Sequence, residues 1–136
     1  MPEGLHHVEI YVRDLGETMT FWSWLLPELG YELFQSWEEG QSWKLGDTYL
    51  VFVQTVQKHQ TPAYHRCRSG LNHLAFHGRS RAHVDALTEA LRERGATVLY
   101  EDRHPYASGP DYYAVFFEDP NRMKVEVVAP EATPAS

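Results

Sequence analysis

The chain of 136 residues contains a single cysteine, Cys67, so it cannot form an internal disulfide. It has no apolar run near the roughly 18 residues that a membrane-spanning helix needs, and its first residues lack the basic and apolar regions of a signal peptide. Twelve Lys and Arg against nineteen Asp and Glu give a net charge of -7, with no basic stripe that would bind a phosphate backbone. These absences predict a cytoplasmic protein with neither a membrane nor a nucleic-acid partner.

The residues that are plentiful point toward a binding site. The chain has eight histidines and a 13% share of aromatic residues, the side chains that line metal centres and apolar pockets. Its length is that of one average domain, and 43% of its residues are hydrophobic, which is enough for a core of its own. We therefore expect a single domain over residues 1–136 that binds a small molecule.

The first half of the sequence has the periodicities of a β-α-β-β-β module over residues 5–54. Residues 5–13 alternate as a strand, and Asp14 is placed to cap a helix that Gly30 ends, with Pro27 expected to kink or tighten its last turn. Three strands are predicted over residues 31–37, 42–45 and 48–54, because turn residues separate these short apolar segments.

The second half repeats the pattern over residues 71–128. A strand over residues 71–77 precedes a helix that Ser80 caps and Gly95 ends, and strands are predicted over residues 97–101, 112–118 and 123–128. An offset of 66 residues aligns His7 with His73 and Asp14 with Ser80. This offset predicts two similar modules, joined by a crossover over residues 55–70 and followed by a frayed tail over residues 129–136.

Strand alternation places three potential metal ligands on the side of the strands away from the helices. His7 shares its side with Glu9 and Tyr11, opposite the apolar residues of the strand, and the same parity applies to His73 and Glu126. Two histidines and one carboxylate suit a divalent Fe, Mn, Zn, Co or Ni ion and leave coordination positions open for substrate. We therefore predict a metal site formed by His7, His73 and Glu126.

Three motifs resemble one known superfamily, the vicinal oxygen chelate proteins. They are LHHVEIYVRD (residues 5–14), GLNHLAFH (residues 70–77) and FFEDPNRMKVEVV (residues 116–128). That superfamily includes glyoxalase I, fosfomycin-resistance thiol transferases, extradiol dioxygenases and metal-free bleomycin-binding proteins. The resemblance implies an α+β fold, in which two βαβββ modules form a curved mixed sheet around a metal-lined cleft, often in a homodimer. It also implies His7, His73 and Glu126 as the metal ligands.

The sequence departs from two members of that superfamily. Glyoxalase I has a fourth ligand, normally Glu, at the position expected for Val51, and the only donor nearby, Gln54, lies on the opposite strand parity. The extradiol signature has a Tyr where this chain has Phe116 and a Gly or Pro where it has Arg122. Three protein ligands therefore suit this chain better than four, and an ordinary ring-cleaving reaction is disfavoured.

Further residues are predicted around the expected metal. Glu126 and Glu9 are the candidate catalytic carboxylates; Glu9 is a base, a partner of a ligand histidine or a solvated strand residue. Aromatic side chains and one loop histidine are candidates for substrate binding, with core packing or a dimer interface as alternatives. The candidate substrate-binding residues are Tyr11, Tyr49, Trp43, His104 and Tyr113.

Two classes of function remain open at this point. The first is a metal-dependent enzyme that acts on a substrate with neighbouring oxygens by isomerase, lyase, transferase or dioxygenase chemistry. The alternative is a metal-free protein that sequesters a small molecule, as bleomycin-resistance proteins do. Such a protein does not need two histidines and a glutamate together. Cys67, although it lies between two arginines, is interpreted as a free cysteine of the crossover.

Overall fold

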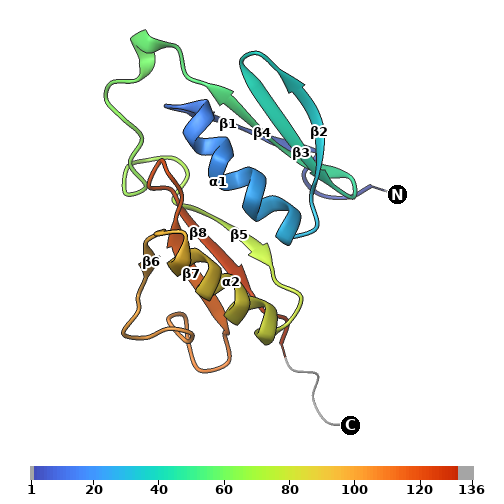
Figure 1. The fold of residues 1–136 in the computed structure, drawn as a ribbon, viewed down its shortest axis with the longest axis vertical. Helices are drawn as coiled ribbons and strands as arrows, with labels where there is room; N and C mark the ends of the chain where they lie inside the picture. The colour runs from blue at the N-terminus through green and yellow to red at the C-terminus, as the bar shows by residue number, and fades with distance from the viewer. Residues whose placement is uncertain (1, 132–136) are drawn as a thin grey trace. The chain divides into compact units, whose positions relative to one another are not determined.

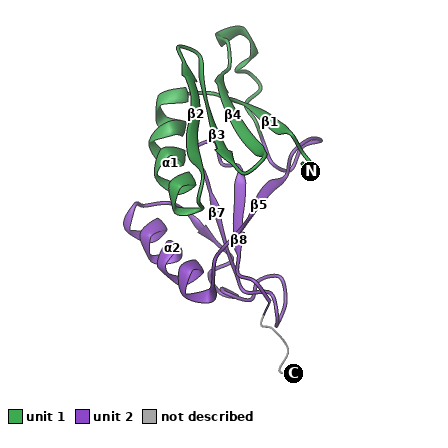
Figure 2. Ribbon diagram, turned by 90° about the vertical axis from the view of Figure 1, so that its right-hand side faces the viewer, with its two compact units in different colours: residues 1–64 green, residues 65–136 purple. Residues whose placement is uncertain are grey.

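The computed structural model describes residues 2–131 and divides the chain into two compact units, Met1–Tyr64 and His65–Ser136 (Figure 2). The predicted tail over residues 129–136 is described only as far as residue 131, and residues 132–136 lie outside the described part. Within the described residues, each unit contains one α-helix and one sheet of four strands, so each is a small α+β unit.

Unit 1 consists of β1 (His7–Val12), α1 (Leu15–Glu28), β2 (Glu32–Trp37), β3 (Gly40–Leu45) and β4 (Thr48–Gln54), followed by a short 3-10 helix, η1 (Gln57–His59) (Figure 1). The strand order in its sheet is β1-β4-β3-β2. The first and last strands are parallel neighbours, and the other two pairs are antiparallel. This arrangement confirms the predicted β-α-β-β-β module.

Unit 2 repeats the arrangement with β5 (His73–His77), α2 (Arg81–Glu93), β6 (Val98–Leu99), β7 (Ala114–Glu118) and β8 (Lys124–Val128). Its strand order is β5-β8-β7-β6, and again the first and last strands of the module are parallel neighbours. The two halves of the chain therefore have the same topology, as the offset of 66 residues predicts.

Both helices begin and end as the sequence predicts. A side-chain oxygen of Asp14 accepts the amide hydrogen three residues on, at 3.0 Å, and Ser80 does the same for α2 at 3.0 Å. Pro27 lies inside α1. The amides of Leu29 and Gly30 donate to carbonyls three residues back at 3.0 Å each, with Leu29 also 3.2 Å from the carbonyl four residues back, which tightens the last turn. Among the described residues, no helix is long and apolar enough to cross a membrane.

Each helix covers one face of its own sheet. In unit 1, Trp22 of α1 and Phe52 of β4 are both 0% exposed, with ring centroids 5.2 Å apart. In unit 2, α2 contacts β7, and its apolar residues Val84 and Leu91 are 0% exposed. Burial of these side chains removes apolar area from water at about 25 cal/mol per Å². The opposite face of each sheet carries the histidines discussed below.

Several strand boundaries differ from the sequence-based prediction; β3, for example, begins at Gly40 rather than at residue 42. β6 ends at Leu99 because Tyr100 adopts the left-handed region, with φ 57°, and its carbonyl accepts the amides of Arg103 and His104 in a turn. β7 begins at Ala114, since the preceding segment still turns through residues 109–112. β5 begins at His73 rather than at residue 71.

Gly40 at the start of β3 provides a test of the packing in unit 1. An added Cβ there would lie 2.5 Å from Cζ2 of Trp37 and 2.7 Å from the carbonyl oxygen of Phe52, which is backbone and cannot move aside easily. We expect Gly40→Ala to lower the free energy of unfolding by about 1–3 kcal/mol. The measurement is urea unfolding followed by tryptophan fluorescence.

The matched control is Gly16→Ala in the first turn of α1. Its added Cβ would meet only an oxygen of Asp14, at an ordinary 3.5 Å, and alanine stabilises a helix by about 0.5–1 kcal/mol relative to glycine. Equal unfolding free energies for the two variants would contradict the packing argument.

Candidate metal centre

The first strand of unit 1 alternates as predicted. His7, Glu9 and Tyr11 are exposed, whereas Val12 is 2% exposed. Tyr49 of β4 pairs with His7 and stacks on its ring, with centroids 4.7 Å apart and planes 4° from parallel. Nδ1 of His7 lies 2.8 Å from Nδ1 of His6. These contacts hold the imidazole of His7 on the face of the sheet opposite α1.

The first strand of unit 2 brings a second histidine to a carboxylate. Nε2 of His73 lies 3.1 Å from Oε1 of Glu126, although the two residues are 53 positions apart in the sequence. The parallel pairing of β5 with β8 causes this contact, since it places His73 beside Lys124 and Ala75 beside Glu126. Glu126 is only 5% exposed, so its carboxylate is a buried charge with few partners.

Asn72 selects the tautomer of the neutral His73 ring. Nδ2 of Asn72 donates to the carbonyl oxygen of Arg66 at 3.0 Å, so its Oδ1 faces Nδ1 of His73, 2.8 Å away. The hydrogen of neutral His73 is therefore on Nδ1, and Nε2 presents a lone pair. That lone pair faces an oxygen of Glu126, and two acceptors this close need a cation between them, either a proton or a metal ion.

Tyr112 holds the other oxygen of the same carboxylate. Its hydroxyl donates to Oε2 of Glu126 at 2.8 Å. Burial, together with this hydrogen bond, raises the pKa of Tyr112 to about 12, so the hydroxyl stays protonated and donates at neutral pH. Oε1 of Glu126 is consequently the oxygen directed at His73.

The donor set in unit 2 fits a divalent metal ion. Two ligand atoms about 2.1 Å from an ion and at right angles to each other lie about 3.0 Å apart, close to the observed 3.1 Å between Nε2 of His73 and Oε1 of Glu126. A ligand histidine in proteins usually donates its other ring hydrogen to an oxygen, as His73 does to Asn72, and a ligand carboxylate is itself hydrogen-bonded, as Glu126 is to Tyr112.

Two of the three predicted ligands therefore contact each other. Within residues 2–131, no three side chains of His, Cys, Asp or Glu form a group that could hold a metal ion. His73 and Glu126 belong to unit 2, and His7 belongs to unit 1. The participation of His7 stays a prediction.

The strand register identifies the counterpart of Glu126 in unit 1. Glu9 pairs with Val51 as Ala75 pairs with Glu126, so Val51 occupies in unit 1 the position of the carboxylate in unit 2. This agrees with the expectation that Val51 replaces a further ligand. In unit 1 the carboxylate is that of Glu9, which lies on the neighbouring strand β1 rather than on β4.

Gln54, the other donor considered there, has a structural role. Its Oε1 accepts the amide of Leu15 at 2.8 Å, and its Nε2 donates to the carbonyls of Arg13 and Thr55 at 2.7 and 3.0 Å. The side chain thus ties the start of α1 to the end of β4. The amide oxygen and the amide nitrogen of Gln54 thus both form their hydrogen bonds at this junction.

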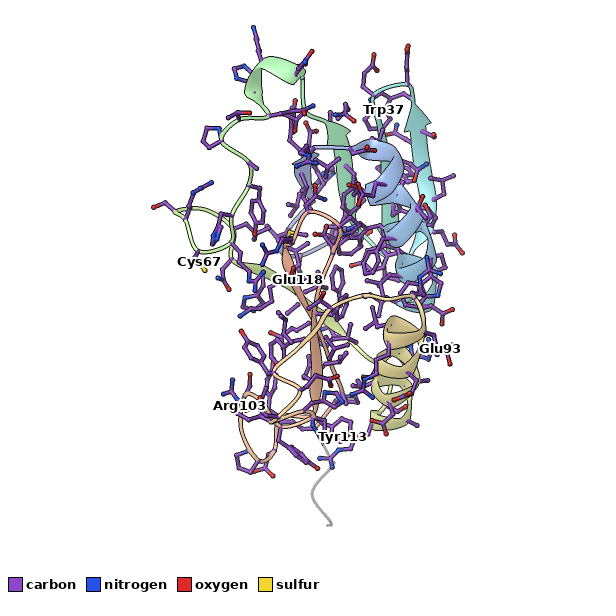
Figure 3. All side chains as sticks on the ribbon, turned by 60° about the vertical axis from the view of Figure 1, so that its left-hand side comes forward. Trp37, Cys67, Glu93, Arg103, Tyr113 and Glu118 are labelled. Atoms are coloured by element: carbon purple, nitrogen blue, oxygen red, sulfur yellow. The ribbon has the colours of Figure 1, made fainter. Side chains whose placement is uncertain are left out.

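Three predicted substrate contacts lie elsewhere within their units. Trp43 is 7% exposed and pairs with Leu50, on the face of the sheet that packs against α1. His104 lies near α2, where burial and then the guanidinium of Arg92 lower its pKa. Tyr113, on the loop before β7 (Figure 3), donates its hydroxyl to Asp85 of α2. These positions leave Tyr11 and Tyr49 as the predicted aromatic contacts on the face of His7.

Asn72 and Tyr112 are the residues that sequence reasoning missed. Asn72 directly precedes a candidate ligand histidine, which is a usable signal, because an amide oxygen is a typical partner of a ligand ring. Tyr112 gives no such signal. It has a tyrosine neighbour, Tyr113, and only the path of the loop decides which of the two reaches Glu126.

Comparison with known proteins agrees with this fold. The sequence model of the glyoxalase/bleomycin resistance protein/dioxygenase superfamily matches residues 6–116. The chain therefore belongs to this superfamily, whose members commonly use divalent metal ions, bind small molecules and often form oligomers.

Individual relatives cover nearly the whole chain. YqjT of Bacillus subtilis (strain 168), an uncharacterized protein, is 56% identical over 126 residues, covering 93% of this chain and 98% of YqjT. A crystal structure from Bacillus halodurans, described provisionally as a glyoxalase, matches with a TM-score of 0.92 at 66% identity, covering 93% of this chain and 95% of that one. The glutathione transferase FosA of Serratia marcescens is 26% identical over 127 residues, covering 93% of this chain and 81% of FosA.

Removal of one hydroxyl tests the role of Tyr112. We expect Tyr112→Phe to weaken the binding of Co²⁺ by about 10–100-fold, because the carboxylate of Glu126 loses the donor that orients it. The measurement is a competition titration against a coloured chelator.

The matched control is Tyr113→Phe, which removes an equal hydroxyl from the neighbouring residue, whose partner is Asp85. Its affinity for Co²⁺ should stay close to that of the unchanged protein. Similar losses in both variants would mean that the loop, rather than the bond to Glu126, determines the affinity.

Proposed function

We propose that this protein is a metal-dependent enzyme that acts on a small molecule with two neighbouring oxygen atoms. The observation that carries the proposal is the contact between His73 and Glu126, in which an imidazole lone pair faces a buried carboxylate oxygen at 3.1 Å. His7 is the third ligand in the proposal, supplied by the same chain or by a second copy. A bound divalent ion supplies Lewis acidity to the two substrate oxygens.

The residues around the centre have separate tasks in this proposal. His73 and Glu126 bind the ion through Nε2 and Oε1. Asn72 keeps the ring of His73 in the tautomer that leaves Nε2 free, and Tyr112 holds Oε2 of Glu126. With only three protein ligands, coordination positions remain for two substrate oxygens.

Glu9 is the proposed base of this centre. It lies two residues after His7 on the same face of β1 and is exposed, so its carboxylate can accept a proton from a substrate bound on that face. Its pairing partner Val51 is apolar and offers no competing hydrogen bond.

Isomerase, lyase, thiol-transferase and dioxygenase reactions all begin on a chelated substrate of this kind, and the name of the relative FosA favours a test of thiol transfer.

Metal stoichiometry in single variants tests the proposal. Protein purified without chelator and loaded separately with Fe²⁺, Mn²⁺, Zn²⁺, Co²⁺ or Ni²⁺ should hold one ion per chain of its preferred metal. His7→Ala, His73→Ala and Glu126→Gln should each abolish stoichiometric binding, because each removes one of three ligands. The measurement is elemental analysis after gel filtration.

The control is His77→Ala, which removes an exposed histidine from β5, the strand that also holds His73. It should bind metal as the unchanged protein does. Undiminished metal in both the His73→Ala and Glu126→Gln variants would reject the site. Tight binding of a small molecule to protein stripped of metal, without turnover of catechols, hemithioacetals or epoxides with thiols, would favour the sequestering alternative.

A substitution that adds a carboxylate at Val51 provides a second test of the proposal. Val51→Glu places a carboxylate at the position that corresponds to Glu126, but on a site that is 5% exposed. Without metal we expect this variant to be about 1–3 kcal/mol less stable, because a charge is buried without a partner. Metal should raise its melting temperature by more than that of the unchanged protein, while any turnover slows, since one substrate position is taken.

Val53→Glu is the control for added charge on the same strand and face. Val53 pairs with Tyr11 and Gly40, two residues further along β4 than Val51. It should lose stability without the additional stabilisation by metal. Equal metal-induced shifts in melting temperature for both variants would contradict the assignment of Val51.

A further inference from the structure

Lys124 lies directly beside the proposed centre and is not explained by it. It pairs with His73 across the parallel strands, and it precedes Glu126 by two residues on β8, so the three side chains share one face of the sheet. Its ammonium is therefore a positive charge about two strand residues, roughly 7 Å, along β8 from the metal-binding carboxylate.

Aromatic contacts hold this ammonium in place. Nζ of Lys124 donates to the hydroxyl of Tyr100 at 3.2 Å, and it lies 5.5 Å from the ring centroid of Tyr100 and 5.8 Å from that of Phe116. Phe116 pairs with Glu126, so the side chain of Lys124 leans toward the centre. Aromatic rings attract a cation without neutralising its charge.

The carboxylate nearest to Lys124 along the sheet has other partners. Glu118 pairs with Lys124 across β7 and β8, but its two oxygens lie 3.4 Å from Arg66 and 3.1 Å from Arg122. Within residues 2–131, no carboxylate forms an ion pair with Lys124. Glu118 is therefore held by two arginines and not by Lys124.

The ring that holds Lys124 is fixed by an unusual backbone conformation. Tyr100 has a φ of 57°, and only one other described residue besides glycine, Arg122, has a positive φ. A tyrosine in this region is strained, and such strain is typical of positions whose side chain must point in one direction. Here the turn directs the Tyr100 hydroxyl to Nζ of Lys124.

We infer that Lys124 and Tyr100 form an oxyanion subsite, so that the substrate carries a carboxylate, phosphonate or similar anionic group beside its two chelating oxygens. The inference rests on the proposed function and adds the class of substrate to it. Lys124 donates to the anion through the hydrogens of Nζ that Tyr100 does not use. Within residues 2–131 its ammonium has no ion-pair partner, and a bound substrate anion supplies one.

A pair of ligands that differ only in charge tests the subsite. In protein loaded with Co²⁺, calorimetry compares 3,4-dihydroxybenzoate with its methyl ester, which has the same neighbouring hydroxyls but no charge. We expect the acid to bind about tenfold or more tightly than the ester in the unchanged protein. Lys124→Gln should remove this preference while ester affinity and metal content stay unchanged, and Lys124→Arg should retain it.

Arg103→Gln is the matched control. Arg103 also lies over the Tyr100 ring, 5.0 Å from its centroid, but it is exposed on the loop between β6 and β7 (Figure 3). It removes the same charge and should leave most of the preference for the acid. An equal loss in the Arg103→Gln and Lys124→Gln variants, or equal affinities for acid and ester in the unchanged protein, would overturn the subsite.

Benzoate separates this inference from the proposed function, because it needs no metal to bind. In metal-free protein it should shift the ring resonances of Tyr100 and Phe116, and Lys124→Gln should abolish the shifts. If neither catechol ligand binds to loaded protein but benzoate behaves in this way, the chelating function is contradicted and the subsite stands. Absence of both the benzoate shifts and a preference for the acid overturns the subsite.

Discussion

The parallel pairing of the first and last strands of each unit is the constraint on which the candidate centre depends. It brings His73 and Glu126 into contact across 53 residues of sequence. A slip of β8 by one residue would turn Glu126 toward α2 and bring an apolar neighbour to the face of His73. Val125 and Val127 resist such a slip, because both are 0% exposed on the helix side and would lose that burial. The hydrophobic core of unit 2 thus holds its polar centre in register.

The two units have the same strand register but carry different side chains at equivalent positions. At equivalent register positions, unit 1 has Tyr49 and Val51 where unit 2 has Lys124 and Glu126. The ring of Tyr49 packs flat against His7, whereas Lys124 lies beside His73 and donates to the hydroxyl of Tyr100. Unit 1 therefore offers an aromatic face with one exposed carboxylate, and unit 2 offers a buried carboxylate with a cation.

The sequence predicts the elements of this fold well, because the signals for them are local. Alternation identifies β1, and capping residues such as Asp14 identify helix starts through a hydrogen bond that spans three residues. The position of Val51 follows from the resemblance to glyoxalase I, and the strand register agrees with it. Local signals fail where the chain leaves regular structure: Tyr100 has strand propensity but turns left-handed, and the loop that follows determines that Tyr112 rather than Tyr113 reaches Glu126.

Because Glu126 is buried, the groups around its carboxylate indicate its role better than its residue type does. A carboxylate that is 5% exposed has lost most of its hydration, which costs several kcal/mol unless donors or cations replace the water. Tyr112 replaces it at Oε2, whereas at Oε1 the neighbour is a lone pair of His73, held in that tautomer by Asn72. If stability alone decided the arrangement, an apolar residue would serve, as Val51 does at the equivalent position in unit 1. Oε1 of Glu126 therefore needs a cation beside it, either a proton on His73 or a metal ion, and the proposed function assigns a metal ion to this place.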